Sequence, residues 1–394
     1  MTDDSPEIRI GLSMQDIDVE QWDNLVRDQS PFLQHAFLRA LEQSGSVQAE
    51  SGWQPCHLTV MVNAGDGEKM LAAMPLYIKN HSYGEYVFDW GWADAYQRYG
   101  QQYYPKLLTA IPFTPSQSPR VLVADGETLQ QWLPHIEQAV LTYADKIGAS
   151  SWHILFPDRA NASVLRQADL IRREASQFHW QNKGYKTFDD FLASFSSRKR
   201  KNLRKERADV VAQGIQFQCL EGEDITEDIW DVFYRYYQNT YQIRGQQGYL
   251  TRDFFRLINR SMPENLFLVM ASQAGNYVAG ALFFKGADTL FGRYWGAEQD
   301  YDNLHFETCY YQGIEYCIEH NISLFDAGAQ GEHKLRRGFE PVTTQSFHWI
   351  KDPAFRAAIA DFCQQEMAHV AAYQSAAIEQ LPFRQTDTVR DSPE

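Results

Sequence analysis

The chain has 394 residues and a formal net charge of -15, from 36 Lys and Arg against 51 Asp and Glu. This length allows more than one domain and a large core, and the acidic balance argues against a protein that coats nucleic acid with its whole surface. The five cysteines have no C-x-x-C spacing and leave an odd one over, which argues against a disulfide framework and against a zinc site.

The N-terminus is acidic and has no apolar run, so it does not have the pattern of a secretory signal. No stretch reaches the roughly 20 apolar residues that a membrane-spanning helix needs. We therefore expect a cytoplasmic protein without a membrane span and without a metal site.

The first half of the sequence predicts a helix after Ser30-Pro31 and then a hairpin, with strands at 57–62 and 70–78 around a glycine-containing turn. Residues 86–90 are expected to continue the sheet. The further elements expected before residue 157 are a strand at 121–124, a helix at 129–147 that ends at Gly148, and a strand at 152–156.

The second half begins with Thr187 and Asp190, which have the spacing of a capping box. The basic tract 198–207 is expected to lie on the helix that follows, which ends at Gly214. The further elements expected are a strand at 215–220, a helix at 229–241, a hairpin of 266–272 with 277–285, and a C-terminal helix from 353 to about 380.

The segment 290–341 predicts a helix between two strands. From Phe306, apolar residues recur at three-to-four spacing, and Asn321 is a suitable left-handed stop. The strand 323–325 then ends at Asp326, where polar loop residues begin. Polar groups at a strand end next to a helix indicate a site on an α/β layer arrangement.

An internal repeat is indicated when Trp90-Gly91 is aligned with Trp295-Gly296, 205 positions later. At nearly the same offset, 74–79 falls on 280–285. The pattern predicts a tandem duplication of α/β domains with mixed sheets. The expected boundaries are an N-terminal domain at 7–175, a C-terminal domain with the site at 176–352, a helix at 353–380 and a disordered tail at 381–394.

The basic tract holds seven Lys or Arg against one Glu between Arg198 and Arg207. On a helix, Arg200, Arg204 and Arg207 share a face and could bind phosphates. The alternative is a solvated helix face. Against the acidic background we favour an anion site, for tRNA, coenzyme A or a nucleotide-linked substrate.

The loop after Asp326 gathers Glu332, His333 and Lys334. Acyl transfer to an amine needs a group that accepts the amine proton and a donor that holds the developing oxyanion, and these residue types supply both. The alternative is a set of surface salt bridges. Motifs for serine hydrolases, P-loop proteins and Rossmann folds are missing, and the H-x-E of His305 and Glu307 has no P-C-x-x-C after it.

Four motifs together resemble the FemAB-like branch of the GNAT superfamily, whose members are described as peptidoglycan biosynthesis or recognition proteins. The motifs are Asp89-Trp-Gly-Trp-Ala-Asp-Ala-Tyr96, Tyr103-Tyr-Pro-Lys-Leu-Leu108 with Ile111-Pro-Phe-Thr-Pro115, the basic tract 197–207, and 325–334 through Gly338-Phe339. The resemblance implies two GNAT-like domains with a C-terminal helix and transfer of an acyl group to an amine. It also implies that Lys334, in a Lys-x-x-x-Gly-Phe pattern, stabilises the reacting carbonyl.

Better-studied Fem ligases take amino acids from aminoacyl-tRNA and add them to a peptidoglycan precursor. This chain shows neither their coiled-coil arm nor the acetyl-CoA loop motif of GNAT enzymes, so the resemblance leaves aminoacyl-tRNA and acyl-CoA as donors, with no tightly bound cofactor. The acceptor is expected to be a small-molecule or peptide amine. The sequence does not indicate the oligomeric state.

We therefore read the chain as an acyl- or aminoacyl-transferase in which Lys334 holds the oxyanion and Asp326 or His333 accepts the amine proton. The residues expected to bind substrate or phosphate are Arg200, Arg204, Arg207, Arg293, Tyr301, Gln330 and Glu332. The alternatives are an acyl-CoA-dependent N-acyltransferase for a small amine and a non-catalytic module that binds cell-wall precursors.

Overall fold

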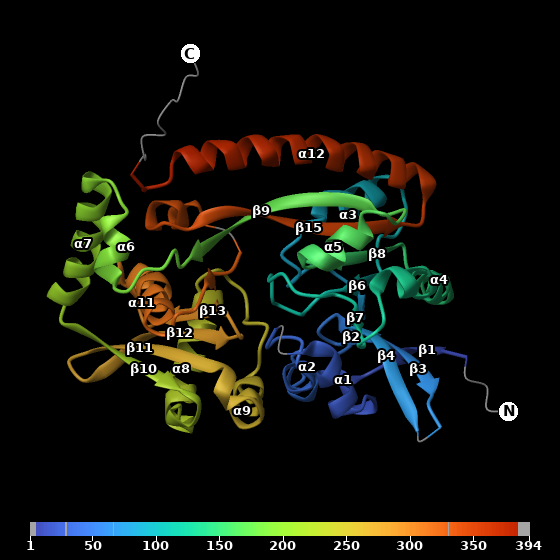
Figure 1. Cartoon of the computed structure of the whole chain (residues 1–394), viewed down its shortest axis with the longest axis horizontal. Coiled ribbons are helices and arrows are strands. Elements are labelled where there is room, and N and C mark those ends of the chain that lie inside the picture. Colours follow the sequence, from blue (N-terminus) through green and yellow to red (C-terminus); the bar gives the residue numbers. More distant parts are fainter. Residues whose placement is uncertain (1–4, 28–29, 66, 330, 385–394) are drawn as a thin grey trace, which may run out of the picture.

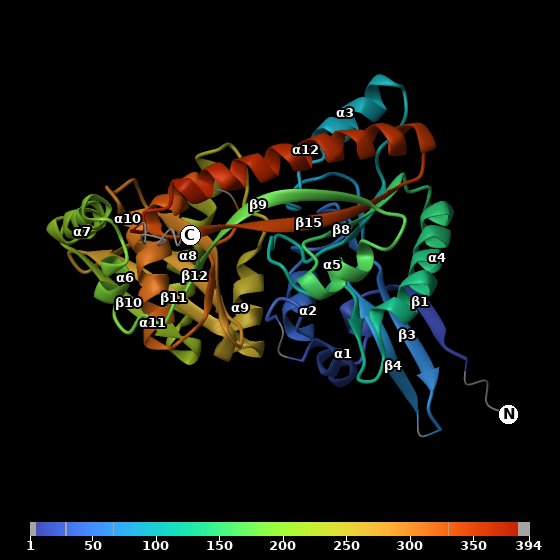
Figure 2. The same ribbon diagram turned by 45° about the horizontal axis from the view of Figure 1, so that its top comes forward.

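The computed structural model describes residues 5–27, 30–65, 67–329 and 331–384. Two α/β halves lie side by side beneath the long C-terminal helix α12 (Pro353–Glu379), as Figure 1 shows. Figure 2 shows α12 running over two long strands, β9 (Ile171–Gln181) and β15 (Glu340–Ile350). The arrangement agrees with the mixed α/β class expected from the sequence.

The first half contains β9 and the strands that precede it in the chain. They are β1 (Glu7–Leu12), β2 (Trp53–Pro55), β3 (His57–Asn63), β4 (Glu68–Met74), β5 (Tyr77–Lys79), β6 (Lys106–Thr109), β7 (Leu122–Val123) and β8 (Ser151–Leu155). The other strands are β10 (Ile215–Glu221), β11 (Leu266–Gln273), β12 (Asn276–Lys285), β13 (Thr289–Ala297) and β14 (Leu324–Asp326).

The helices cover the faces of these strands. In the first half they are α1 (Val19–Val26), α2 (His35–Gln43), α3 (Trp90–Arg98), α4 (Leu129–Ile147) and α5 (Arg159–Leu165). In the second half they are α6 (Phe188–Ala193), α7 (Ser197–Ala212), α8 (Glu227–Gln242), α9 (Arg252–Ser261), α10 (Leu304–Phe306) and α11 (Gln312–Glu319), with a π-helical turn, Glu307–Tyr311, between α10 and α11.

One mixed sheet runs through both halves, in the order β10-β11-β12-β13-β14-β9-β15-β8-β6-β5-β2. Strand β15 pairs with β9 along nine positions and with β8 on its other side. Strand β9 pairs at its end with β14 of the second half. The two halves are thus joined by backbone hydrogen bonds, and a separate sheet, β1-β3-β4-β7, belongs to the first half alone.

The apolar core is also continuous between the halves. The ring of Phe32, which precedes α2, lies 5.0 Å from the rings of both Phe284 and Phe291. All three side chains are at most 6% exposed. Aromatic pairs at this separation add to the free energy of burying the rings, so the core stabilises the contact between the halves.

Local sequence explains several elements. Thr187 and Asp190 form the expected capping box at the start of α6. Strands β11 and β12 are joined by Ala274-Gly275, both at positive φ, which is the backbone of a type I′ hairpin turn. Asn321 takes the expected left-handed conformation after α11, with φ of 55°.

The segment 86–90 differs from the expected strand. Tyr86 has a positive φ of 61°, which breaks an extended strand, and α3 begins at Trp90. Trp295 lies instead in β13, so the two aligned Trp-Gly pairs occupy different elements. A Cβ on Gly296 would come within 2.1 Å of the Tyr236 backbone of α8, whereas a Cβ on Gly91 would meet nothing, so the two glycines serve different purposes.

The expected boundary between residues 175 and 176 falls inside β9, while the boundary at 352 coincides with the start of α12. Residues 381–384 of the expected tail are placed against the second half, where Phe383 forms a β-bridge with Phe195. The remaining tail, 385–394, lies outside the described residues. Across the described chain, no helix combines the length and the apolar character needed to span a membrane.

Candidate active site

A cavity of about 460 Å³ opens where β13 and β14 diverge. These parallel strands pair at only three positions, from Thr289 with Leu324 to Phe291 with Asp326, and β13 continues to Ala297 paired with β12 on its other side. Ligand sites of α/β folds commonly lie where strands diverge at their carboxyl ends. We call this space the reaction cavity.

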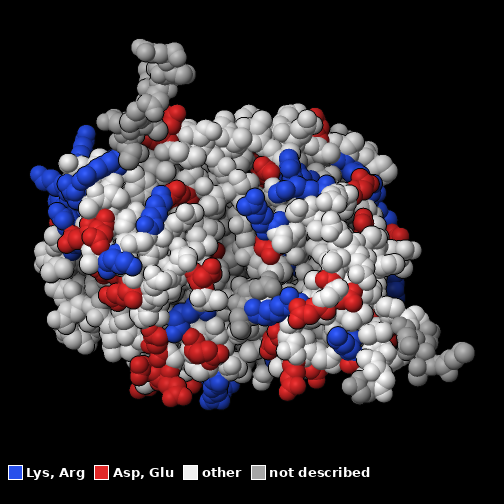
Figure 3. All heavy atoms as spheres, in the orientation of Figure 1, with Lys and Arg blue, Asp and Glu red and all other residues white. Residues whose placement is uncertain are grey.

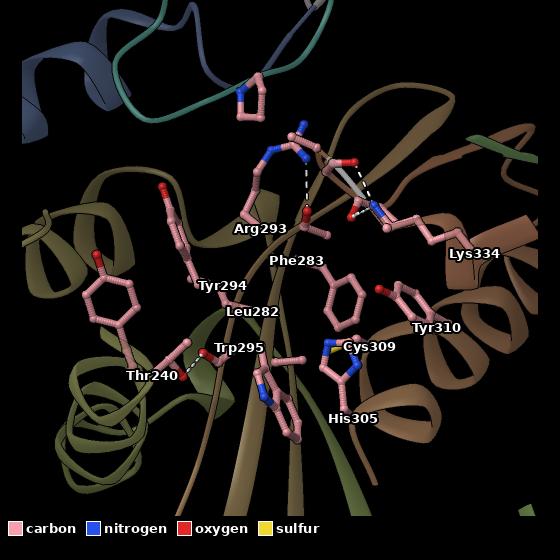
Figure 4. Close-up of a pocket in the computed structure, with 18 of the residues that line it drawn as sticks. Thr240, Leu282, Phe283, Arg293, Tyr294, Trp295, His305, Cys309, Tyr310 and Lys334 are labelled. Atoms are coloured by element: carbon pink, nitrogen blue, oxygen red, sulfur yellow. Dashed lines mark hydrogen bonds between the residues drawn. The ribbon is translucent and has the colours of Figure 1, made fainter. Parts of the chain in front are cut away.

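Residues from both halves line the reaction cavity. In Figure 4, Lys334 and Tyr310 lie on one side and Thr240 and Tyr294 on the other. The polar and aromatic lining residues of the second half include Tyr237, Thr240, Tyr241, Arg244, Arg293, Tyr294, Trp295, His305, Cys309, Tyr310, His333 and Lys334. The first half contributes Tyr86, Phe113 and Pro115.

Lys334 is 2% exposed and sits on a 3₁₀ turn, Glu332–Arg337. Its Nζ donates to the carbonyl oxygens of Ala327 at 2.9 Å and Gly328 at 2.7 Å. An ammonium has three donors, so one has no partner among the described residues and can serve a ligand in the cavity. Burial lowers the pKa of Lys334 to about 8, which leaves the side chain mainly charged at neutral pH.

Asp326 is 1% exposed and is held by Arg293 from β13. Arg293 donates to Asp326 Oδ2 at 2.8 Å, and the Gly328 amide donates to Oδ1, also at 2.8 Å. Burial by itself would raise the pKa of Asp326, but the Arg293 charge and these hydrogen bonds lower it to about 2. The carboxylate therefore fixes Arg293 and the loop that presents carbonyls to Lys334.

His333 shares the cavity wall with Tyr310, and their Nε2 and hydroxyl oxygen lie 2.8 Å apart. Burial, together with the charges of Arg337 and Lys334, lowers the pKa of His333 to about 4. His305 also lines the cavity, and burial lowers its pKa to about 4 as well. Both imidazoles are thus neutral at pH 7 and keep a lone pair that can accept a proton.

The π-helical turn Glu307–Tyr311 brings the side chains of Cys309 and Tyr310 to the cavity. It inserts one residue into the helical repeat between α10 and α11. Such π-turns occur frequently at functional sites. The turn was not predicted, because the apolar spacing after Phe306 is the same as that of a regular α-helix.

Comparison with known proteins gives the family. A family model described as FemAB-like, peptidoglycan biosynthesis/recognition, matches residues 13–385. The chain belongs to the FemAB-like family. Among curated protein sequences, none matches the chain.

Two solved structures show the fold of this FemAB-like protein. FemX aligns at 13% identity over 87% of this chain and 98% of that one, with a TM-score of 0.53. The C-terminal domain of a putative lysylphosphatidylglycerol synthetase from Agrobacterium fabrum aligns at 12% identity over 90% and 96%, with a TM-score of 0.52. Both alignments cover the two halves of this chain, and they confirm the mixed α/β fold expected from the sequence.

The three arginines expected to share one face of α7 have different surroundings. Arg207 is held by Glu307 at 2.8 Å and Glu315 at 2.7 Å and lies over the Phe188 ring. Arg204 is largely exposed and pairs with Asp189 at 2.9 Å. Arg200 has no polar partner within the described chain. Figure 3 shows Lys and Arg gathered over α7 at the upper left of the molecule.

The other expected binding residues are dispersed. Tyr301 packs against an apolar cluster that includes Val210 and Leu304 and is not among the lining residues of the cavity. Glu332 accepts a hydrogen bond from the Tyr373 hydroxyl at 3.1 Å, on the outer side of the 3₁₀ turn. Gln330 lies outside the described residues.

Sequence reasoning did not identify the aromatic wall formed by Tyr86, Tyr237, Tyr241 and Tyr294. The aromatic run from Tyr234 to Tyr241 on α8 is visible in the sequence, but such a run is more often part of a core than of a binding surface. Phe113 and Pro115 lie in a motif that carried the family resemblance, without any indication that they reach the second half. Among the described residues, no cluster of three or more metal-ligating side chains was found.

Proposed function

We propose that this FemAB-like protein transfers an acyl or aminoacyl group from an activated donor to an amine, in the reaction cavity between β13 and β14. The observation that carries the proposal is Lys334, a buried ammonium with two hydrogens fixed by backbone carbonyls and the third without a partner in the described part of the chain. Oriented donors of this kind stabilise the oxyanion of acyl transfer.

In the proposed reaction, the acceptor amine attacks the donor carbonyl carbon and a C–N bond forms. The carbonyl oxygen becomes an oxyanion that accepts a hydrogen bond from Lys334. The C–O or C–S bond to the leaving group then breaks, and the amine gives up one proton. A charged lysine in a buried cavity stabilises the oxyanion more than it could in water.

His333 suits the role of proton acceptor better than Asp326. Both Asp326 oxygens are engaged by Arg293 and Gly328, and the pKa of the carboxyl is lowered to about 2. His333 is neutral, lines the cavity and contacts Tyr310, which can hold one tautomer in place. Asp326 is therefore a positioning residue that keeps Arg293 and the Gly328 loop in place.

The donor contains phosphate in either reading, as aminoacyl-tRNA or as acyl-CoA. Arg244 lines the reaction cavity and has no ion-pair partner within the described chain. Arg198, Lys201 and Lys205 on α7 are exposed and also unpaired there. We propose that the phosphates of the donor bind to Arg244 and to the unpaired basic residues of α7. The printed family description supports an acceptor related to peptidoglycan precursors, and the cytoplasm stays the proposed compartment.

The test is a turnover assay that offers charged tRNA and acyl-CoA in parallel, each with an amine acceptor. We expect Lys334→Met to lose transfer with whichever donor is used, while Arg336→Met, on the same turn but exposed and unpaired, keeps it. Full turnover in Lys334→Met would remove the proposed chemistry. Binding of donor that weakens steeply with salt and with Arg200→Met/Arg204→Met would favour tRNA.

A further inference from the structure

A second chamber of about 440 Å³ lies behind the reaction cavity. It is lined by residues of β9, β15, α12 and the segment 86–88. Tyr86 and Ala329 line both spaces, so the two are adjacent. Ala329 follows directly after the carbonyls that hold Lys334. One end of a molecule bound in the second chamber can therefore lie close to Lys334 in the reaction cavity.

The chamber has no free positive charge. Arg173 is the single Lys or Arg among its lining residues, and it makes two hydrogen bonds to Glu366, at 2.6 and 2.8 Å. Its third nitrogen donates to the Phe88 carbonyl at 2.8 Å. A phosphate placed here would lose its hydration without gaining a cation, which is unfavourable. The phosphates of the donor thus belong elsewhere.

Most of the lining is apolar, and the rim exposes large rings. Phe88 is 53% exposed and Tyr373 is 36% exposed, and both line the chamber. Phe362 on α12 is 49% exposed and lies 6.0 Å from the Arg173 guanidinium. Exposed aromatic residues gathered around a hollow are typical of a binding site for an apolar group.

The floor of the chamber also offers a hydrogen-bond acceptor. Gln177 is 3% exposed, and its Nε2 donates to the Pro115 carbonyl at 2.9 Å. Its Oε1 is buried and has no hydrogen-bond partner within the described chain. Ser346 and Thr344 also line the chamber, but their hydroxyls have protein partners, His348 Nε2 at 2.8 Å and the Ala175 carbonyl at 3.4 Å. A buried amide oxygen without a partner is costly, and a ligand N–H would satisfy it.

We propose that the second chamber binds the uncharged part of the amine acceptor, an apolar group attached through an amide, as in an amide of a hydrophobic amino acid. The inference rests on the proposed function, because it places the reacting amine in the reaction cavity. The ring of the acceptor packs against Phe88 and Tyr373. Its amide N–H donates to Gln177 Oε1. The part of the acceptor that the chamber selects is then neutral and apolar, and any phosphate that the acceptor carries lies outside the chamber.

The test uses two dipeptide amides of equal length, alanyl-phenylalaninamide and alanyl-glutamic acid amide, with binding to the full chain measured by calorimetry. We expect the phenylalanine probe to bind at least tenfold more tightly. Val370→Trp, which fills the chamber from α12, should weaken this probe at least tenfold. Ala368→Trp, exposed on the same helix and outside the chamber, should change its Kd by less than twofold.

His369→Trp fills the chamber from an exposed position and serves as a second variant should Val370→Trp fold poorly. Equal affinities for the two probes would overturn the proposal, as would an unchanged Kd in both filling variants. Octanoyl-CoA binding that Val370→Trp abolishes, with dipeptide binding intact, would assign the chamber to the acyl chain of the donor and overturn it too. Lys334→Met separates the two proposals, because it should lose transfer and still bind the phenylalanine probe.

Discussion

Lys106 in the first half and Lys334 in the second half are both buried lysines near carboxylates, but their hydrogens are used differently. Lys106 donates to Ser82 at 2.9 Å, to Glu85 at 2.8 Å and to Asp89, so all three hydrogens have partners. Lys334 donates two hydrogens to backbone carbonyls, and its third has no partner within residues 331–384 or the other described ranges. A buried charge whose donors are all used can hold a structure together, whereas one with a free donor beside a cavity can act on a ligand.

The surroundings of the two lysines extend this difference. Asp89 also accepts from the Tyr103 hydroxyl at 2.7 Å, and the chain of contacts continues through His153 to His348 of β15. These groups tie α3 and β6 to the strand that joins the halves. The atoms around Lys334 are instead backbone carbonyls of a loop, with the cavity on the other side.

The largest expected effect is on stability. Replacing Lys106 with Met leaves buried Asp89 without its lysine and leaves Glu85 with only Lys79, whose Nζ lies 3.9 Å away. We expect the free energy of unfolding to fall by about 3–5 kcal/mol. Urea denaturation would measure it. In Lys334→Met, cavity water can replace the lost hydrogen bonds, so the loss should stay within about 1 kcal/mol. Equal losses in the two variants would show that Lys334 is also structural.

The second effect is on rate. Lys334→Met should lower turnover by about 10²–10³-fold, the effect of removing one oxyanion donor. Steady-state kinetics with the identified donor would measure it, with Arg336→Met as the matched control. A rise in KM with an unchanged kcat would instead indicate that Lys334 only binds substrate.

A third test separates the arginines of α7. Arg207→Met leaves Glu307, which is 3% exposed, without its cation, and we expect a loss of about 2 kcal/mol in the free energy of unfolding. Arg204→Met removes an exposed pair and should cost less than about 1 kcal/mol. Donor binding should respond in the opposite order, with Arg204→Met the more harmful. The reverse result in a binding titration would assign phosphate contact to Arg207.

The smallest effect concerns pH. Lys334 can donate to an oxyanion only while protonated, and its pKa is lowered to about 8. At saturating substrates, kcat should therefore fall about tenfold for each unit of pH above 8. A kcat profile between pH 6 and pH 10 would show it. The decline should be missing from the residual activity of Lys334→Met, and its persistence there would assign the titration to another group.

The sequence predicted much of what is local. The capping box of α6, the β11–β12 hairpin and the stop at Asn321 follow from neighbouring residues, and all are present. The placement of Lys334 beside a strand end also followed from the order of elements in the chain. Such features depend on interactions within a few residues, which periodicity and turn chemistry record.

The features that the sequence did not predict depend on contacts between residues that lie far apart in the chain. Arg207 looked like a phosphate ligand because its partners, Glu307 and Glu315, are about a hundred residues away. Likewise, nothing near Asp326 in the sequence indicates that Arg293 neutralises it, and nothing near Tyr86 indicates that it reaches the second half. A charge pattern shows which residues are charged, but the fold decides which charges are already paired.

The sheet that joins the halves also has a consequence for synthesis on the ribosome. Strand β9 is complete at residue 181, but β15, its partner over nine positions, begins only at residue 340. Strand β8 also pairs with β15, so this edge of β8 stays unpaired until β15 has been synthesised. A nascent chain therefore exposes strand edges of its first half until residues 340–350 emerge, and such edges invite pairing with other chains. Chaperone demand should persist until β15 has emerged and paired with β8 and β9.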